Sequence, residues 1–275
     1  MKNILAYNYN LKNPNIYKVN NNIYVKDNSG IYLLEKVTKK KIEYEISSID
    51  KSFNEIMHTK NNNIFVKYKN NIYILERINP QVINDKEIIK DYKNRKIIKQ
   101  NRWKELWINK VDKIEKLKIV DKNIIELNSY FLGMAETAIS FLNNNKEEIE
   151  EKQNSICRIR INDKEYRNNN NIILDYKERD YAEYSKYLFF SKKEKKAINF
   201  IKQIDFKKYS KILIYSRLLF PTYYFDIIEN KVLNNKISEK QINLIKNNIE
   251  RYESFLVKIS IILFDKLAIK WLNKK

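Results

Sequence analysis

Residues 155–190 hold the side chains whose types and spacing are suited to chemistry. The segment consists of an apolar arm, a polar Asn-rich turn and a second apolar arm that ends on Asp175. The apolar positions, which predict two strands, are Ile156, Ile159 and Ile161 in the first arm and Ile172, Ile173 and Leu174 in the second. Phosphoryl transfer uses a strand–loop–strand of this kind, with one acid on the first arm to accept the substrate proton and another after the second arm to hold a metal. Asp175 supplies the second acid, whereas the first arm carries Arg158 and Arg160.

Length and composition limit the kinds of structure that can position this segment. The chain has 275 residues, which is enough for one large domain or for two lobes of about 100 to 170 residues each. Its content of 43% hydrophobic and 13% aromatic residues allows a sizeable core, so the default expectation is a folded protein. The only two glycines, Gly30 and Gly133, leave almost no material for a glycine-rich loop that approaches phosphate closely.

The formal net charge of +20 is large, and two explanations compete for it. Lysine, asparagine and isoleucine dominate together, which is typical of a protein encoded by an AT-rich genome. The lysines are also spread along the whole chain, so we favour this compositional bias over a binding patch. Nucleic acid or another acidic surface stays open as a partner on charge grounds alone.

The cysteine and histidine content argues against several kinds of site. Cys157 is the only cysteine, which excludes an internal disulfide and fits a reducing compartment. It stands among isoleucines, and we expect it to be a small buried hydrophobe. His58, the only histidine, lacks the neighbours that a zinc site needs. We expect no signal peptide, because Met1 is followed by only a brief apolar run, and no apolar run reaches the roughly 18 residues of a membrane helix.

Residues 1–78 predict a small lobe of antiparallel strands with one packed helix. Two β-hairpins are indicated, each by two apolar runs around a polar turn. The runs are residues 23–25 and 31–34, which flank a turn containing Gly30, and residues 64–66 and 72–75, which flank residues 69–71. Between the hairpins, apolar residues recur at spacings of four and three, which predicts a helix over residues 41–57. Residues 76–80 are the expected hinge.

From about residue 81 the pattern predicts helices. Two apolar faces are Trp103, Leu106, Trp107, Val111, Ile114 and Leu117, and then Ile124, Leu127, Phe131, Ala135, Ala138, Ile139 and Leu142. Gly133, inside the second of these helices, predicts a close contact with another helix. Among these and later positions we expect Leu106, Phe131, Ala135, Ile139 and Leu256 to be largely buried.

Further helices are expected after the central hairpin. Residues 192–205 and 207–220 each predict an amphipathic helix, and Pro221 stops the second one. A capping box at residues 238–241 then opens one long final helix. Its apolar stripe extends from Ile242 to Trp271, and the additional apolar residues beside the stripe favour burial inside a helical lobe over a coiled coil.

Four motifs carry a resemblance to a known family. They are WKELWINKVDKIE from Trp103, LGMAETAI from Leu132, DYKERDYAEY from Asp175 and RLLFPTYYF from Arg217. In this order they resemble the kinase-like spore-coat proteins of the CotS/YutH type, which are related to aminoglycoside and choline phosphotransferases. Tyr223 stands where the family usually has histidine. The motifs cover residues 100–230, and the small lobe matches in outline.

The resemblance implies an α+β fold of the protein-kinase-like, two-lobed type. Residues 1–78 would form the small antiparallel-sheet lobe, and residues 81–275 a larger, mainly helical lobe that contains the hairpin at residues 155–176. Relatives with activity carry His-Gly-Asp-Leu where this chain has Arg158-Ile-Arg160-Ile. The residue that would act as the base is therefore Arg160, which stays cationic near neutral pH.

Other site positions implied by the resemblance also depart from the pattern. The second metal ligand, normally Asn, falls on Glu165, and Asn162 or Asn168 would replace it only with a remodelled loop. The lysine that holds the α- and β-phosphates aligns with Glu35, or with Lys36 after a slip of one residue, and such a slip reverses the strand face. Asp175 is the one conventional metal ligand. We expect Arg160 to lie several ångströms from Asp175, and a pair between them would occupy the former metal site.

The implied function is a degenerate, catalytically inactive kinase-like protein that serves as a structural or assembly component of the spore coat. Its expected partners are other spore-coat proteins, with no membrane or nucleic acid. It would be made in the mother-cell cytoplasm and then join the coat. No cofactor is expected. The alternative is a divergent ATP-dependent small-molecule phosphotransferase, which would need ATP and magnesium.

Simpler structural roles compete with these assignments. Asp175 would then cap a turn at a strand end, and Asp180 would be a helix N-cap. Arg217 and Asp226 would pair within the core. The Trp103 and Trp107 side chains are expected to pack against each other and not to form a base-stacking platform.

Overall fold

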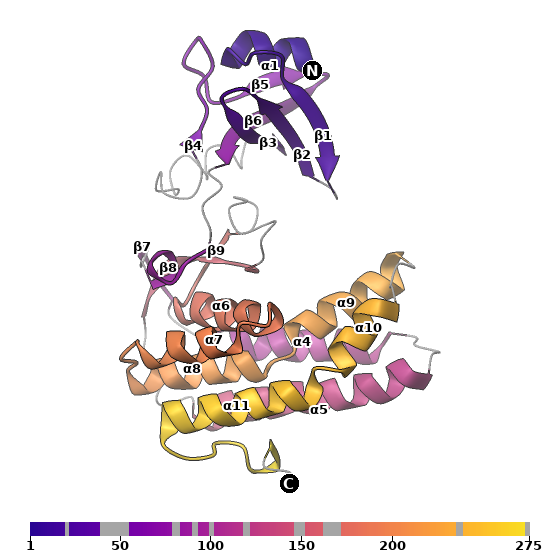
Figure 1. Ribbon diagram of the computed structural model, residues 1–275, viewed down its shortest axis with the longest axis vertical. Helices are drawn as coiled ribbons and strands as arrows, with labels where there is room; N and C mark the ends of the chain where they lie inside the picture. Colours follow the sequence, from indigo (N-terminus) through magenta and orange to yellow (C-terminus); the bar gives the residue numbers. More distant parts are fainter. Residues whose placement is uncertain are drawn as a thin grey trace. The chain divides into compact units, whose positions relative to one another are not determined.

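The computed structural model of the chain forms two compact units (Figure 1). It describes residues 1–19, 22–38, 55–78, 83–89, 93–98, 102–117, 122–145, 152–161, 172–234 and 239–272. The first unit consists of Met1–Glu87 and Arg158–Ile173, and the second of Ile88–Cys157 and Leu174–Lys275. The sequence analysis put the division at residues 78–81 and assigned the whole hairpin to the second lobe.

The first unit is built on an antiparallel sheet. Its strands are β1 (Asn15–Val19), β2 (Asn22–Asp27), β3 (Gly30–Val37), β4 (Glu55–Ile56), β5 (Val66–Tyr68) and β6 (Asn71–Ile78). They are ordered β1-β2-β3-β6-β4, and β5 also pairs with β6. Every described pair of strands in this sheet is antiparallel, as the sequence predicted.

Helix α1 (Lys2–Tyr9) covers one face of this sheet. Leu5 and Tyr9, one turn apart, are buried against a cluster that includes Leu34 and Leu75. The sequence predicted strands and turns for this segment, and that prediction is wrong. The apolar pair at i and i+4 was the available signal.

Both predicted hairpins are confirmed, with turns that explain their register. In the first, the Asp27 carboxylate accepts hydrogen bonds from the backbone N–H groups of Ser29 (2.8 Å) and Gly30 (3.1 Å). Partial burial would raise the pKa of Asp27, but hydrogen bonds from Ser29, Lys12 and Gly30 outweigh it and lower that pKa. In the second, Lys69 and Asn70 both have positive φ, which suits a tight two-residue turn.

The predicted helix over residues 41–57 is corrected at its end. Residues 39–54 lie outside the described part of the chain, but Glu55 and Ile56 form β4, which pairs with β6. Sheet pairing there overrides the local helical spacing. The expected hinge also begins too early, because Glu76–Ile78 still belong to β6, and residues 79–80 are not described.

A second, three-stranded sheet has the order β7-β8-β9. Its strands are β7 (Lys93–Ile98), β8 (Lys152–Arg158) and β9 (Ile172–Asp175). Strands β8 and β9 confirm the two arms of the predicted hairpin, although Ile159 and Ile161 follow the end of β8. The helical prediction from residue 81 onward missed β7, which pairs antiparallel with β8.

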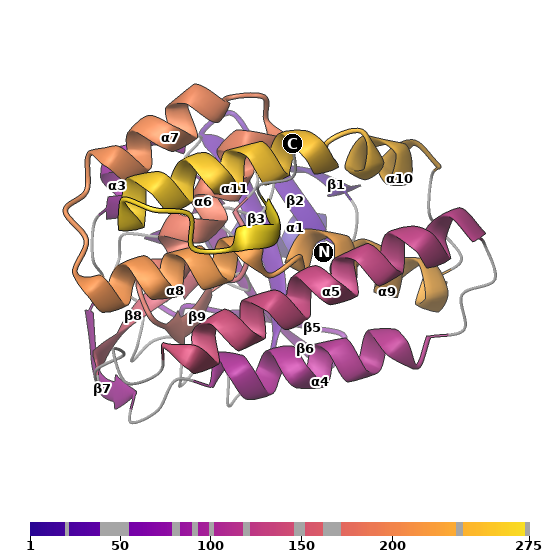
Figure 2. The same ribbon diagram turned by 90° about the horizontal axis from the view of Figure 1, so that it is seen from below.

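The other regular elements of the described chain are helices. They are α3 (Asp85–Ile89), α4 (Trp103–Glu115), α5 (Lys122–Asn144), α6 (Glu178–Phe190), α7 (Glu194–Lys202), α8 (Lys208–Leu219), α9 (Thr222–Asn234), α10 (Glu239–Lys246), α11 (Ile249–Phe264) and the 3-10 turn η3 (Lys270–Leu272). Helix α6 packs on α7 and α8, α5 packs on α4 and α8, and α11 lies against α7 and α8 (Figure 2). Among the described residues, no helix has the length and apolarity needed to cross a bilayer.

The helix faces are mostly as predicted. Phe131, Ala135 and Leu256 are buried, and Ile139 is half-buried. Leu106 was expected in the core but is 53% exposed. The buried stripe of α4 is Trp103, Trp107, Val111 and Ile114, and Leu106 lies just off its edge.

Two expectations about helix detail were wrong. The single long final helix is divided into α10 and α11 at Asn247–Asn248, and α11 ends at Phe264, followed by the C-cap residue Asp265, whose φ of 56° is left-handed. Residue 238 of the predicted capping box is not described. Gly133 makes no close helix contact, because a Cβ built there would meet no heavy atom within 4 Å.

Candidate functional site

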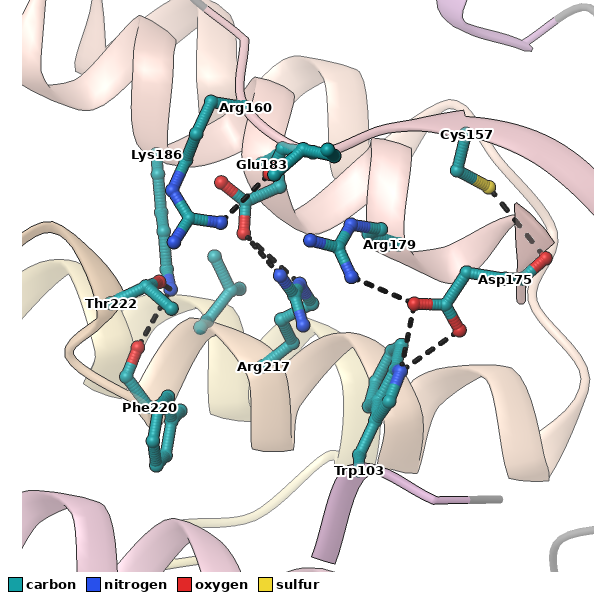
Figure 3. A network of polar contacts seen from close by, with 12 residues as sticks. Trp103, Cys157, Arg160, Asp175, Arg179, Glu183, Lys186, Arg217, Phe220 and Thr222 are labelled. Carbon is teal, nitrogen blue, oxygen red and sulfur yellow. Dashed lines mark hydrogen bonds and ion pairs between the residues drawn. The ribbon is translucent and has the colours of Figure 1, made fainter. Parts of the chain in front are cut away.

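Asp175, at the end of β9, is surrounded by hydrogen-bond donors (Figure 3). The indole Nε1 of Trp103 donates to Oδ1 at 2.9 Å and to Oδ2 at 3.0 Å. Arg179 Nη1 donates to Oδ2 at 2.8 Å, and the backbone N–H of Tyr176 donates to Oδ1 at 2.8 Å. The Asp175 residue is 7% exposed, so these protein groups replace water around the carboxylate.

Local chain geometry places two of these donors. Asp175 ends a strand, and α6 begins three residues later, so Arg179 reaches back to Asp175 across one turn. The third donor, Trp103, comes from the first residue of α4. It is fixed by stacking on Trp107, with ring centroids 5.6 Å apart, and by the Arg217 guanidinium, which lies 5.1 Å from its ring centroid. The packing expected of the two tryptophans is therefore confirmed, and Trp103 also donates a hydrogen bond.

A second buried ion pair joins α6 to α8. Arg217 contacts Glu183 Oε1 through Nη2 at 2.9 Å and through Nε at 3.0 Å, and these side chains are 3% and 5% exposed. Arg217 and Asp226 were expected to pair within the core, and the described contacts give each of them another partner. Asp226 lies 3.5 Å from Lys110 Nζ on α4.

The first turn of α6 gathers further buried charge. Lys177 Nζ lies 3.3 Å from Asp180 Oδ2, and Ser210 Oγ donates to Glu178 Oε1 at 2.6 Å. Acidic residues are stabilised at this end of a helix by its dipole. Asp180 is not the N-cap that the sequence predicted, because Lys177 takes that position and Asp180 lies inside the first turn.

Lys186 extends the polar network along α6. Its Nζ donates to the Phe220 carbonyl at 2.8 Å and to Thr222 Oγ1 at 3.2 Å, which fixes the turn at Pro221 between α8 and α9. The predicted stop of α8 at Pro221 is confirmed. The same turn borders a small cavity of about 40 Å³, half of whose lining residues are aromatic.

The first arm of the hairpin and the residues directly after it hold Arg158 and Arg160, and Arg160 is the residue at which the sequence resemblance implied a base. Arg160 is half-buried, and its Nη1 donates to the Ile159 carbonyl at 2.8 Å. Arg158 is 1% exposed, with its Nη2 at 3.9 Å from Glu87 Oε1. The cation paired with Asp175 is Arg179, and the sequence analysis did not single out this pair. An acid followed four residues later by arginine at a helix start was the available signal.

Strand register places the two candidates for the phosphate-holding position. Glu35 lies opposite Ile74 on β6 and is buried, with Val37 on the same side of the strand. Lys36 lies opposite Tyr73 and is exposed. The side chain of Glu35 is thus buried, whereas the exposed Lys36 points to the opposite face of the strand, which also carries Leu34.

The described residues do not fit a magnesium site. Magnesium takes oxygen ligands in near-octahedral geometry, usually including one or two carboxylates. The Asp175 carboxylate already accepts four hydrogen bonds, one of them from a guanidinium. The described ranges contain no group of three or more His, Cys, Asp or Glu side chains that could hold a metal ion. Glu165, Asn162 and Asn168 lie outside those ranges.

The one cysteine has a structural role, and the one histidine lies at the surface. Cys157 is a free, fully buried thiol whose Sγ donates to the Tyr176 carbonyl at 3.2 Å, as expected of a small core residue. Burial raises its pKa well above the usual value, which opposes thiolate formation. His58 is exposed.

The fold defines a class of protein. The fold is similar to that of an aminoglycoside phosphotransferase from Alicyclobacillus acidocaldarius, known from a crystal structure. The match covers 96% of this chain and 96% of that protein's chain, with a TM-score of 0.58 at 10% sequence identity. Together with the antiparallel sheet and the helical unit, this similarity shows a kinase-like, two-lobed α+β fold. At that identity it shows the fold alone.

The family is narrower than the fold. Residues 2–259 match the family described as "Spore coat putative kinase YutH", and the chain belongs to that family. The endospore coat-associated protein YutH of Bacillus subtilis (strain 168) is 29% identical over 187 residues, which are 56% of this chain and 55% of that protein. The chain therefore matches about half the length of this curated relative.

Proposed function

We propose that this protein is a spore-coat component built on a phosphotransferase fold that has lost phosphate transfer. It serves in coat assembly or structure, and it needs neither ATP nor magnesium. Its partners are other coat proteins. The coat assignment rests on the family and on the name of the Bacillus subtilis relative.

One observation carries the loss of catalysis. Asp175, the only conventional metal ligand in the motif, is held by Trp103 and Arg179. To coordinate magnesium it would have to give up a buried, charge-assisted hydrogen bond, and such bonds contribute about 1.5–3 kcal/mol each. The guanidinium would then remain beside the metal and repel it.

Two further residues support the same conclusion. Arg160 stands at the base position and cannot accept a proton near neutral pH. Glu35, buried at the position of the phosphate-holding lysine, would repel the phosphates of a nucleotide. Phosphoryl transfer depends on positioning and charge stabilisation, and both are altered here.

The direct test is ATP turnover by the full chain with magnesium or manganese, over a panel of amino-alcohols and aminoglycosides. We expect no turnover above background, and no nucleotide binding that depends on magnesium in a fluorescent-nucleotide titration. The variant Arg160→Asp should stay inactive, because Glu35 and the occupied Asp175 remain. Turnover that disappears in Asp175→Asn would overturn the proposal and support the divergent small-molecule phosphotransferase.

The coat assignment has its own test. A fluorescent fusion of the full chain, expressed during sporulation, should form a shell around the developing spore and stay with the coat fraction on extraction. Arg160→Asp should localise in the same way, because the proposed role does not use the base position. A fusion that stays diffuse in the mother cell would contradict the coat role and leave the activity assay unaffected.

A further inference from the structure

The chain after α11 folds back as a strap, which we define as residues 265–272 (Figure 2). Its first end is fixed by Ser260, whose buried hydroxyl donates to the Lys266 carbonyl at 3.0 Å and accepts from the Ala268 N–H at 2.7 Å. At its second end Trp271 Nε1 donates to Thr137 Oγ1 on α5 at 3.3 Å. Leu272 is buried beside this contact. The strap is therefore anchored at both ends.

A groove of about 1140 Å³ lies between the strap and helices α5 and α8. Small-molecule pockets usually measure about 300–1,000 Å³, so this groove has the size for a stretch of polypeptide. Gly133 lies in its wall, and the open space around that residue leaves room for a backbone. Because both ends of the strap are fixed, a bound segment would not have to order the groove first.

The groove lining is basic and partly apolar. Lys208, Lys266 and Lys270 contribute positive charge, and Glu136 is the one acidic residue among the lining residues described. Partly buried apolar side chains stand between the charges, namely Phe141, Phe264, Leu267 and Trp271. Ser140 and Asn144 add exposed polar groups that suit hydrogen bonds to a peptide backbone.

We propose that the groove between the strap, α5 and α8 binds an extended acidic segment of a partner protein, with carboxylates on the lysines and apolar side chains against Leu267 and Trp271. Charge complementarity selects this occupant over a second copy of this chain, because each copy carries a net charge of +20. The site lies within the second unit and uses none of the residues around Asp175. It therefore stands or falls independently of phosphate transfer.

The probe is a short fluorescein-labelled peptide in which Glu and Leu alternate, titrated with the full chain by fluorescence anisotropy at physiological ionic strength. A companion peptide has Gln in place of Glu. We expect the Glu peptide to bind more tightly than the Gln peptide, because only the Glu peptide offers carboxylates to the groove lysines. Equal binding of the two peptides would contradict the proposal.

Matched variants locate the binding. Lys266→Glu with Lys270→Glu should weaken binding of the Glu peptide by about tenfold, since two attractive contacts become repulsive. The control is Lys195→Glu with Lys202→Glu, which changes the net charge equally on exposed positions of α7 outside the groove. The control should change the affinity by less than about twofold. Equal losses in the two double variants would show unspecific charge attraction and overturn the proposal.

Filling the groove gives an independent test. Gly133→Trp places a large side chain in the groove wall and should abolish peptide binding, whereas Gly133→Ala keeps most of the space and should bind as the wild type does. Thermal unfolding of both variants checks their fold, and the exposed lysine variants decide the question if Gly133→Trp unfolds.

Sedimentation velocity tests whether a second copy of this chain occupies the groove. A dimer of the wild type that Gly133→Ala keeps and Gly133→Trp loses would assign the groove to a second copy and overturn the proposal.

Discussion

The second unit contains two sets of carboxylate–cation ion pairs in opposite surroundings. The buried set consists of Asp175 with Arg179 and Glu183 with Arg217, and the exposed set consists of Glu194 with Arg251 and Lys258. Side chains in the buried set are at most 10% exposed, whereas Arg251 and Lys258 are 36% and 52% exposed. Distances do not separate the sets, because the buried pairs are 2.8 and 2.9 Å long and the exposed pairs are 2.9 and 3.2 Å long.

Burial decides what each set can do. A buried charge that loses its partner cannot recruit water, so each buried pair commits both residues to one geometry. An exposed charge that loses its partner is hydrated again at little cost. Asp175 belongs to the first kind, and this explains why a carboxylate at a metal-ligand position can act as a structural residue.

Breaking the pair between Glu183 and Arg217 should have the largest effect. Arg217→Met leaves the Glu183 carboxylate buried without this partner and should destabilise the protein by about 3–5 kcal/mol, measured by urea unfolding. The double variant Glu183→Leu with Arg217→Met should recover most of that loss, because neither charge of this pair is then left buried without the other. A loss below about 1 kcal/mol in Arg217→Met would place this pair with the exposed set.

Removing one donor from Asp175 should have an intermediate effect. Trp103→Phe deletes the indole N–H that contacts both carboxylate oxygens, with an expected cost of about 1–3 kcal/mol beyond the lost packing. Trp107→Phe is the matched control. It removes the same atoms from a neighbouring tryptophan that is also buried and that, among the described contacts, donates no hydrogen bond to Asp175. Equal destabilisation by the two variants would show that packing alone holds Trp103.

The exposed set should give the smallest effect and a specific dependence on pH. Partial burial tends to raise the pKa of Glu194, but contacts with Lys258 and Arg251 lower it overall. A depressed folded-state pKa contributes stability above the unfolded value of about 4.3, and this contribution is lost as the pH falls through the folded-state pKa. Glu194→Gln should therefore cost below about 1 kcal/mol at neutral pH and almost nothing in strong acid. High salt should reduce the neutral-pH effect, and a cost that persists in strong acid would contradict the assignment.

Much of the architecture was accessible from local patterns. The hairpins around Gly30 and residues 69–71 carry turn residues that permit their geometry, and the apolar stripe of α5 fixes both the helix and its buried face. Local patterns did not predict the segments that are short or ambiguous. Strand β4 and helix α1 are only two and eight residues long, and the pairing or burial that stabilises each comes from residues distant in sequence.

The candidate site, too, could be predicted from the sequence only in part. The types of residue at Arg160, Glu35 and Asp175 can be read directly from the chain, and they already argue against a catalytic base and a phosphate-holding lysine. The Trp103 donor to Asp175 could not be read, because it lies 72 residues away and its indole reaches the carboxylate only after α4 has packed. The pairing of Glu183 with Arg217, 34 residues apart, depends likewise on α6 meeting α8.

The sequence by itself determined which chemical groups this protein has. It also determined the hydrophobic periods that form its strands and helices, because these periods depend on neighbouring residues. The tertiary structure alone decided which charges are buried and which partners distant in sequence they take. Burial depends on the packing of distant elements, and burial sets the cost of an unpaired charge. The same carboxylate at Asp175 would suit a metal in an open site, and here Arg179 and Trp103 make it part of the structural core.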